Sequence, residues 1–484
     1  MSWLRETHTD CFSRECETRL GGGHLKFTCT NKKCLHETKI NKSKMMPGLS
    51  AAGKPCAPKA VNTARGVAAF MAAGIAESNA NQVLLGMDMP PLNTNVWAAH
   101  GETFAAATKT NLDRLILENI EKEKAATLLY EGESCLTSDG KVKIKVMTDG
   151  SWQKRYGRNS LYGIGAMYGY YTGLVVFADD RCARCQVCLT AASRGVEVAA
   201  DHNDKCTNTW SEGEAASLME RDIALAGVNF LYQHDCVVAT LICDGDTKTV
   251  QHIRDKGPRA VADVIDVWLD LNHVEKNVGT KLRDLRVGLS SGECEYLQKG
   301  FCRGVKESRR KHPANGVIPG SEEEKRCVQF LQEEVRATPG HLFNKDAHVG
   351  CMEDCPMKAA NLAIYNLQHV PHGLGAWSDP GPDDIKYKAV LQIFMDYTTY
   401  DMAAKLIYDC TTNPCEGVNS MTWDKMGKTH FAPTSATAHM RMAQLHKNDG
   451  QGAATLEVMK TMGVASSSPE TQKKLIKMDE ARRK

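Results

Sequence analysis

The alternation of apolar and polar residues between positions 141 and 180 predicts three antiparallel strands joined by turns. From Lys141 to Val146 apolar residues alternate with lysines, the period-2 pattern of a half-buried strand, and this strand runs into Asp149-Gly150. Two more β-rich runs, 161–168 and 174–178, are joined by a Gly-Tyr-Tyr-Thr-Gly turn. Asp149 is therefore expected at the mouth of the first strand, either as a simple turn residue or as a rigidly held ligand.

More acidic residues follow two further predicted strands. The continuous apolar run Cys236–Cys243 is typical of a strand buried on both faces, and it ends at Asp244-Gly-Asp246. Residues 260–269 predict another strand, which ends at Asp270. Helical spacing of apolar residues from Leu271 onward puts Asp270 and His273 on one polar face. The alternative for Asp270 is an ordinary helix N-cap.

Helical patterns occupy most of the remaining chain. Alanine-rich windows at 63–78, 96–108 and 111–129 predict an all-helical region before the strands, and 214–227 and 402–410 predict two later helices. A further helix opens within 411–423, with Asn413 as cap and Pro414 at the first position. Glu416 then lies in the first turn, where a capping-box role is the alternative to a functional one.

Composition restricts the class of protein. The 484 residues are 42% hydrophobic and 24% charged, which indicates a folded chain of about three domains. The formal net charge of +2 gives no global field, so any polyanion site must come from a local patch. The start has no apolar signal-peptide region, and no run predicts a transmembrane helix. The 19 cysteines are therefore interpreted as thiols or zinc ligands rather than disulfides.

Three groups of cysteine and histidine have spacings that suit zinc. The best match is a CxxC pair followed by an HxxxC pair, with buried structural cysteines as the alternative and Cys188 as a spare ligand; its members are Cys182, Cys185, His202 and Cys206. Two weaker groups are Cys11, Cys16, Cys29 and Cys34, with His24 or His36 as substitutes, and His348, Cys351 and Cys355.

One dense basic cluster interrupts a less regular stretch. It predicts either contacts with nucleic-acid phosphates or a solvated face, and it contains Arg303, Lys306, Arg309, Arg310 and Lys311.

The acidic residues and their neighbours resemble those of the Mutator-like transposase domain, in its Kolobok-like group of DDE enzymes. The resemblance covers about residues 10 to 440. Its motifs here are Asp149-Gly-Ser-Trp-Gln-Lys-Arg155 with the strands behind it, Cys182 to Cys206, Asp244-Gly-Asp246, Asp270-x2-His273 with Lys276, and Thr411 to Trp423. The chain departs from the family pattern at Arg155-Tyr-Gly-Arg158, where Arg-Gly-His is usual, and at Cys415 and Gly417, where Asn and Ser flank the glutamate.

The resemblance implies an α/β, ribonuclease-H-like mixed sheet with a large helical insertion. It implies that Asp149, Asp244 and Glu416 hold two Mg²⁺ or Mn²⁺ ions, with His273 beside them, for nicking transposon ends and strand transfer. Support is expected from Asp246, Asp270, Trp152 and Arg155. The expected partners are double-stranded DNA and a second copy of the chain, in the nucleus and away from membranes. The alternatives are a degenerate or domesticated zinc-dependent DNA-binding protein and a nuclease without strand transfer.

These patterns predict six segments. They are a zinc-ribbon-like segment with a linker at 1–55, a helical region at 56–138, the first part of the catalytic core at 139–286 with a Cys/His insertion at 180–210, a helical insertion at 287–400, the catalytic helix region at 401–440 and a helical tail at 441–484.

Overall fold

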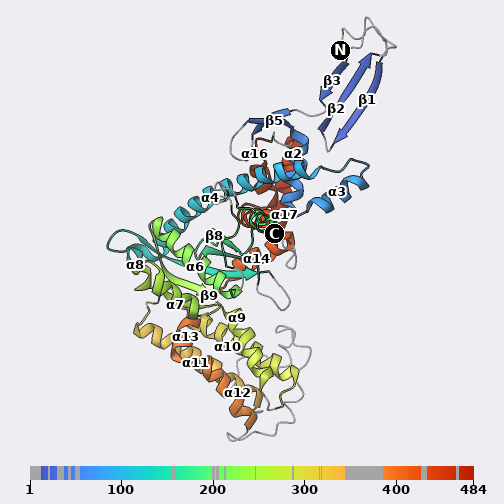
Figure 1. Cartoon of the computed structure of the whole chain (residues 1–484). Helices are drawn as coiled ribbons and strands as arrows, with labels where there is room; N and C mark the ends of the chain where they lie inside the picture. The colour runs from blue at the N-terminus through green and yellow to red at the C-terminus, as the bar shows by residue number, and fades with distance from the viewer. Residues whose placement is uncertain are drawn as a thin grey trace.

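The computed structural model describes residues 12–19, 22–29, 37–41, 45–49 and 55–483, apart from 154–159, 199–201, 203–205, 212–213, 246, 286–287, 315–316, 318, 344–384, 427–432 and 465–467. Within these residues the protein is an α/β structure around a five-stranded mixed sheet (Figure 1). No helix of the described part has both the length and the apolar character needed to cross a membrane.

The central sheet has the strand order β10-β9-β6-β7-β8. Strands β6 (Val142–Trp152), β7 (Tyr162–Gly169) and β8 (Val175–Cys182) are antiparallel neighbours, which confirms the predicted three-stranded unit. Strand β9 (Cys236–Cys243) is parallel to β6 and buried almost throughout, as its apolar run predicts. Strand β10 (Asp266–Leu269) extends the sheet in parallel with β9.

The strand predicted for residues 260–269 is wrong in its first half. Residues Arg259–Ala262 form the short helix α8 directly after Pro258, and only the last four residues of the run pair with β9. Pro258 favours a helix start because its φ is already fixed near the helical value. The apolar content of the run was thus a correct signal of burial but not of strand length.

The two faces of β7 pack against different helices. Successive strand residues point to opposite faces, so Gly163, Gly165 and Met167 share one face. Helix α6 (Ala216–Gln233) lies against it so closely that a Cβ on Gly165 would be 2.8 Å from Ile223. On the other face, Tyr162 contacts α14 (Asn413–Met426) and the Tyr168 hydroxyl donates to Gln444 of α15 (Pro433–Asp449). The glycine-rich sequence of β7 therefore lets a helix approach the sheet closely.

The N-terminal segment contains two small antiparallel sheets and three helices. Strands β1 (Phe12–Arg19), β2 (Gly22–Cys29) and β3 (Glu37–Asn41) form one sheet, and β4 (Met45–Leu49) and β5 (Pro55–Ala60) form the other. The linker predicted within residues 1–55 thus contains strand structure. Helices α2 (Val61–Ala72), α3 (Glu77–Gly86) and α4 (Thr94–Glu131) confirm the predicted helical pattern, with two predicted windows merged in α4.

The remaining elements are mostly helical. Between the strands lie η1 (Gly132–Cys135), α5 (Gln186–Arg194) and α7 (Thr247–Lys256). After β10 come α9 (Leu271–Asp284), α10 (Ser291–Lys311), α11 (Glu322–Phe343), α12 (Ile385–Asp396) and α13 (Tyr400–Leu406), which form a helical group at one end of the molecule (Figure 1). The chain then returns to the sheet in α14 and α15 and ends in α16 (Gln451–Thr461) and α17 (Pro469–Arg483).

Candidate active site and cysteine cluster

Strand register brings the first two acidic residues to the same edge of the sheet. In the parallel pair β6 and β9, Met147 lies opposite Ile242. Asp149 and Asp244 are each two residues further along, just past the last paired residues of β6 and β9. Asp244 follows the end of β9, whereas Asp149 lies within β6, opposite Ala166 of β7, and not at the strand end or in the turn that its sequence predicts. Burial and the charge of Asp244 raise the pKa of Asp149 to about 6, although the Asn419 amide donates to its carboxylate at 2.8 Å. Two crowded carboxylates at one sheet edge are an environment that favours a cation.

His273 of α9 lies between Asp244 and Glu416. Its Nδ1 is 2.6 Å from Oδ2 of Asp244, and its Nε2 is 2.7 Å from Oε1 of Glu416. The hydrogen bond to Asp244, with help from Glu416, raises the pKa of His273 to about 9, and the same contact lowers the pKa of Glu416. His273 is therefore a cation at neutral pH that bridges two carboxylates.

A buried aspartate fixes helix α14, which carries Glu416. Asp270 is 1% exposed and accepts hydrogen bonds from the backbone N–H and the hydroxyl of Thr412, at 2.9 and 2.6 Å. Its other oxygen accepts from the backbone N–H of Asn272 at 2.8 Å and so caps α9. The N-cap interpretation of Asp270 is confirmed, and the same side chain joins the starts of α9 and α14.

One face of α14 follows strand β6. Glu416, Asn419 and Trp423 are spaced three and four residues apart, so they lie on one side of the helix. Asn419 contacts Asp149, and the Trp423 indole N–H donates to Oγ of Ser151 at 2.8 Å. The sequence patterns did not identify Asn419 as a partner of Asp149. Its position one helical turn after Glu416 is the feature of the sequence that indicates a place on the same face of the helix.

The other predicted support residues have different surroundings. Trp152 is the last residue of β6 and has a side chain exposed to 37%. Lys276, one turn after His273, lies 3.5 Å from Oε1 of Glu416. Arg155 and Asp246 lie outside the described residues.

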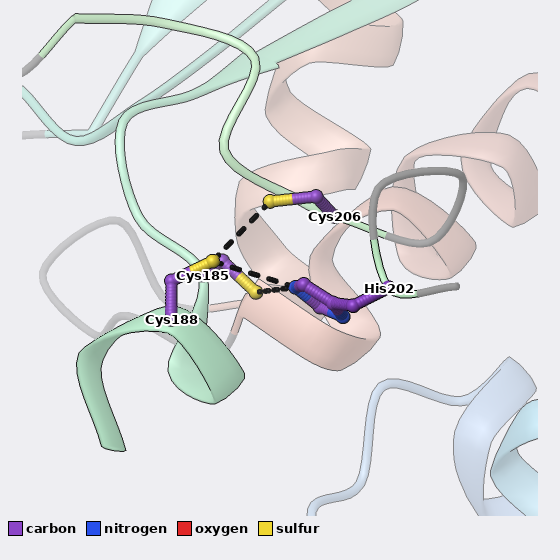
Figure 2. Close-up of side chains that lie close together, drawn as sticks. All are labelled: Cys185, Cys188, His202 and Cys206. Atoms are coloured by element: carbon purple, nitrogen blue, oxygen red, sulfur yellow. Dashed lines mark hydrogen bonds between the residues drawn. The ribbon is translucent and has the colours of Figure 1, made fainter. Parts of the chain in front are cut away.

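Three cysteines and one histidine form a compact cluster beside the sheet (Figure 2). The possible ligand atoms of Cys185, Cys188, His202 and Cys206 all lie within 4.8 Å of one another. His202 Nε2 is 3.2 Å from the Cys185 sulfur and 3.4 Å from the Cys188 sulfur, and the Cys188 and Cys206 sulfurs are 3.5 Å apart. Tetrahedral zinc with bonds of about 2.0 to 2.3 Å separates its ligand atoms by about 3.5 to 3.8 Å. The cluster thus has a suitable size and donor set.

The cluster contains Cys188 where the sequence prediction has Cys182. Cys182 ends β8, and its thiol donates to the backbone oxygen of Arg184 at 3.0 Å. Cys188 lies in the first turn of α5, three residues after Cys185, so the two sulfurs come from adjacent positions on one turn. Against the effect of burial, hydrogen bonds from backbone N–H groups lower the pKa of Cys185 to about 6, which favours the thiolate.

The two weaker zinc predictions cannot be assembled from the described residues. Cys16 lies inside β1 opposite Leu25, rather than on a turn, and Cys29 ends β2. The other members, Cys11, Cys34, His348, Cys351 and Cys355, lie outside the described residues.

The predicted basic cluster is divided by the structure. Arg309 is largely buried and donates to the backbone oxygen of Leu406 at 2.8 Å. Arg310 pairs with Glu307, and Lys311 pairs with Glu334. Arg303 and Lys306 instead line a cavity of about 270 Å³ on α10, together with Lys299. Within the predicted cluster, Arg303 and Lys306 are therefore the better candidates for phosphate contact.

Comparison with known proteins identifies the family of this chain. A search of curated proteins finds no match. The sequence profile of the family described as Mutator-like transposase matches residues 5–359, which include Asp149, Asp244 and His273 but stop before Glu416. Helix α14, which lies outside the matched region, carries Glu416, whereas Asp149 and Asp244 lie within the match. Since the match spans well over half of the 484 residues, this chain belongs to the Mutator-like transposase family.

Proposed function

We propose that this transposase uses Asp149, Asp244 and Glu416 as a carboxylate triad for divalent-metal-dependent cleavage of DNA at transposon ends, followed by strand transfer. The observation that carries the proposal is the convergence of the three acids, from β6, β9 and α14, around His273. The strand order, with three antiparallel strands followed by two parallel ones, supports a ribonuclease-H-like fold for this core.

The residues fit Mg²⁺ or Mn²⁺ by their chemistry. Both ions prefer carboxylate oxygens and keep water and phosphate as remaining ligands. Burial and the charge of Asp244 raise the pKa of Asp149, so a nearby cation would stabilise its ionised form. Asp149, Asp244 and Glu416 would be the residues that hold the ions. When bound, a pair of these ions lowers the pKa of a water nucleophile and neutralises charge on the attacking and leaving oxygens.

The neighbouring residues hold the acids in position. Asn419 orients the Asp149 carboxylate through its amide, and Asp270 fixes the start of α14 and hence Glu416. His273 lies in contact with two of the acids and supplies positive charge near a bound phosphate. Lys276, with its side chain 64% exposed, is positioned to contact the DNA backbone beside them.

The cysteine cluster is proposed as a structural zinc site. It has four donors and contributes no open position, which is the arrangement of structural rather than catalytic zinc. It would tie the α5 segment, inserted after β8, to the loop that precedes α6. A DNA partner is implied by the family, and a dimer that joins two ends and a nuclear location are further parts of the proposal.

Plasmid DNA that carries the ends of the chain's own element provides the test. The unmodified protein should nick it in Mg²⁺ but not in EDTA, whereas Asp149→Asn and Asp244→Asn should bind it and leave it intact. Binding without any metal-dependent cleavage by the unmodified protein would instead support a domesticated DNA-binding protein. Cleavage without joining of the freed 3′ end would support a nuclease.

A further inference from the structure

A cavity of about 210 Å³ lies at the other end of the β6 and α14 pair, away from the acidic residues. Its lining includes Gln153, just past the end of β6, and Trp423, on α14. Gln153 is four residues from Asp149, or about 13 Å in extended chain, and Trp423 is two helical turns from Glu416, or about 10 Å. The cavity is thus about three to four base-pair steps from the triad.

Besides the hydroxyl of Tyr162, two buried polar atoms in this lining have no partner among the described residues. They are Oε1 of Gln153, a residue exposed to only 2%, and Nδ1 of His439, a residue exposed to 7%. Burial lowers the pKa of His439 to about 4, so its imidazole is neutral at physiological pH. Buried polar groups are nearly always paired, and an unpaired one costs free energy. Two around one cavity indicate that the cavity receives a polar guest.

Two tryptophans are among the remaining lining residues, which also include Met71, Glu77 and Lys425. Trp97 of α4 is partly buried, and Trp423 is fixed by its hydrogen bond to Ser151 and by an edge contact with Tyr162. Flat apolar faces beside a few hydrogen-bonding groups are the features by which proteins hold an unstacked nucleobase. A phosphate would not use the aromatic faces.

We propose that this cavity receives one nucleobase rotated out of the DNA near the cleaved bond. The inference rests on the proposed DNA-cleaving function, to which it adds a base-binding subsite. Gln153 and His439 hydrogen-bond the edge of the base, and the tryptophans contact its face. Taking a base out of the stack distorts the strand close to the acidic residues and helps expose the phosphate to be cut.

A short homopolymeric duplex of dA opposite 5-iododeoxyuridine provides the probe, because every register offers the same base. Ultraviolet irradiation of the complex should cross-link the iodinated base to Trp97 or Trp423, as mapped by mass spectrometry. Cross-links confined to the exposed Trp152 would overturn the proposal and leave a cavity that holds only water.

The variant Gln153→Leu separates a binding role from a structural one. Leucine keeps most of the volume and removes an unpaired acceptor, so Tm should stay the same or rise while cross-linking falls several-fold. Gln444→Leu is the matched control, because this equally buried glutamine is engaged by Tyr168. It should lower Tm and leave the cross-link yield per folded molecule unchanged. Unchanged cross-linking in Gln153→Leu would overturn the proposal.

Different outcomes test the proposed function and the base-binding subsite. If the protein neither binds nor cleaves DNA in a mobility-shift and nicking assay, the proposed function fails. If it cleaves in Mg²⁺ while Gln153→Leu cross-links as the unmodified protein does, only the base-binding subsite fails.

Discussion

Thr412 donates both its backbone N–H and its hydroxyl to the same oxygen of buried Asp270. This joint holds the start of α14 against the start of α9, and thereby sets Glu416 opposite His273. The position of the third acidic residue thus depends on a residue that is itself outside the triad.

Removal of this joint should weaken both fold and activity. Asp270→Ala leaves three donors unpaired, so the free energy of unfolding should fall by about 2 to 4 kcal/mol. Urea denaturation measures this change. Thr412→Val removes only the hydroxyl and should cost about 1 kcal/mol. An Asp270→Ala protein as stable as the original would contradict the assigned role.

His273→Ala should depress DNA cleavage strongly and leave DNA binding within a few-fold. The loss of one contact with DNA costs about 1 to 2 kcal/mol of binding free energy. For cleavage the loss is larger, because Asp244 and Glu416 both lose the protonated imidazole that lies between them. Mobility shift and nicking assays on the same preparation measure the two effects. Loss of stability in proportion to loss of cleavage would indicate a purely structural histidine.

Stabilisation by Mg²⁺ should increase with pH. The pKa of Asp149 is raised from 3.8 to about 6, so its protonated form stabilises the metal-free fold at low pH, and this contribution is lost as pH rises through 6. Above that pH the ionised group costs up to about 3 kcal/mol, which a bound cation offsets. The surrounding groups are Asp244, Glu416, Asn419 and His273, and His273 stays protonated over this range because its pKa is about 9.

Thermal unfolding with and without Mg²⁺ at about pH 5.5 and about pH 7.5 measures this effect. The Mg²⁺-induced rise in Tm should be larger at the higher pH, and Asp149→Asn should abolish it at both. An equal rise at both values, retained in Asp149→Asn, would show that Mg²⁺ binds elsewhere.

Zinc content should distinguish Cys188 from Cys182. Cys188→Ser removes a member of the cluster and should lower zinc from about one per chain, whereas Cys182→Ser should retain it, since Cys182 bonds to a backbone oxygen instead. Elemental analysis after treatment with a weak chelator gives the answer. The reverse pattern would restore the ligand set expected from sequence.

Sequence patterns predicted the structure correctly where the pattern lay within a single strand or helix. The alternation before Asp149 and the apolar run before Asp244 identified β6 and β9, and with them the edge at which both acids lie. Helical spacing identified α9 and Asp270 as its cap. These signals depend on local burial and capping, which a sequence records directly.

Relationships between distant elements were not accessible in the same way. Nothing local distinguishes Cys182 from Cys188, because each is part of a CxxC pair and only the turn into α5 decides which sulfur faces His202. The contact between Asp270 and Thr412 joins residues 142 positions apart. The residues of the basic cluster also look equivalent in the sequence, although folding buries Arg309.

Cleavage of element-end DNA by Glu416→Gln tests the triad most directly, because this residue lies outside the family match. An amide retains the shape of the side chain but removes the charge that binds Mg²⁺. Glu293→Gln, at the capping box of α10, is the control, since an amide serves equally well there. Glu293→Gln should nick this DNA as the unmodified protein does, while Glu416→Gln should fold and bind it but not nick it in Mg²⁺. Equal nicking by Glu416→Gln would contradict the triad.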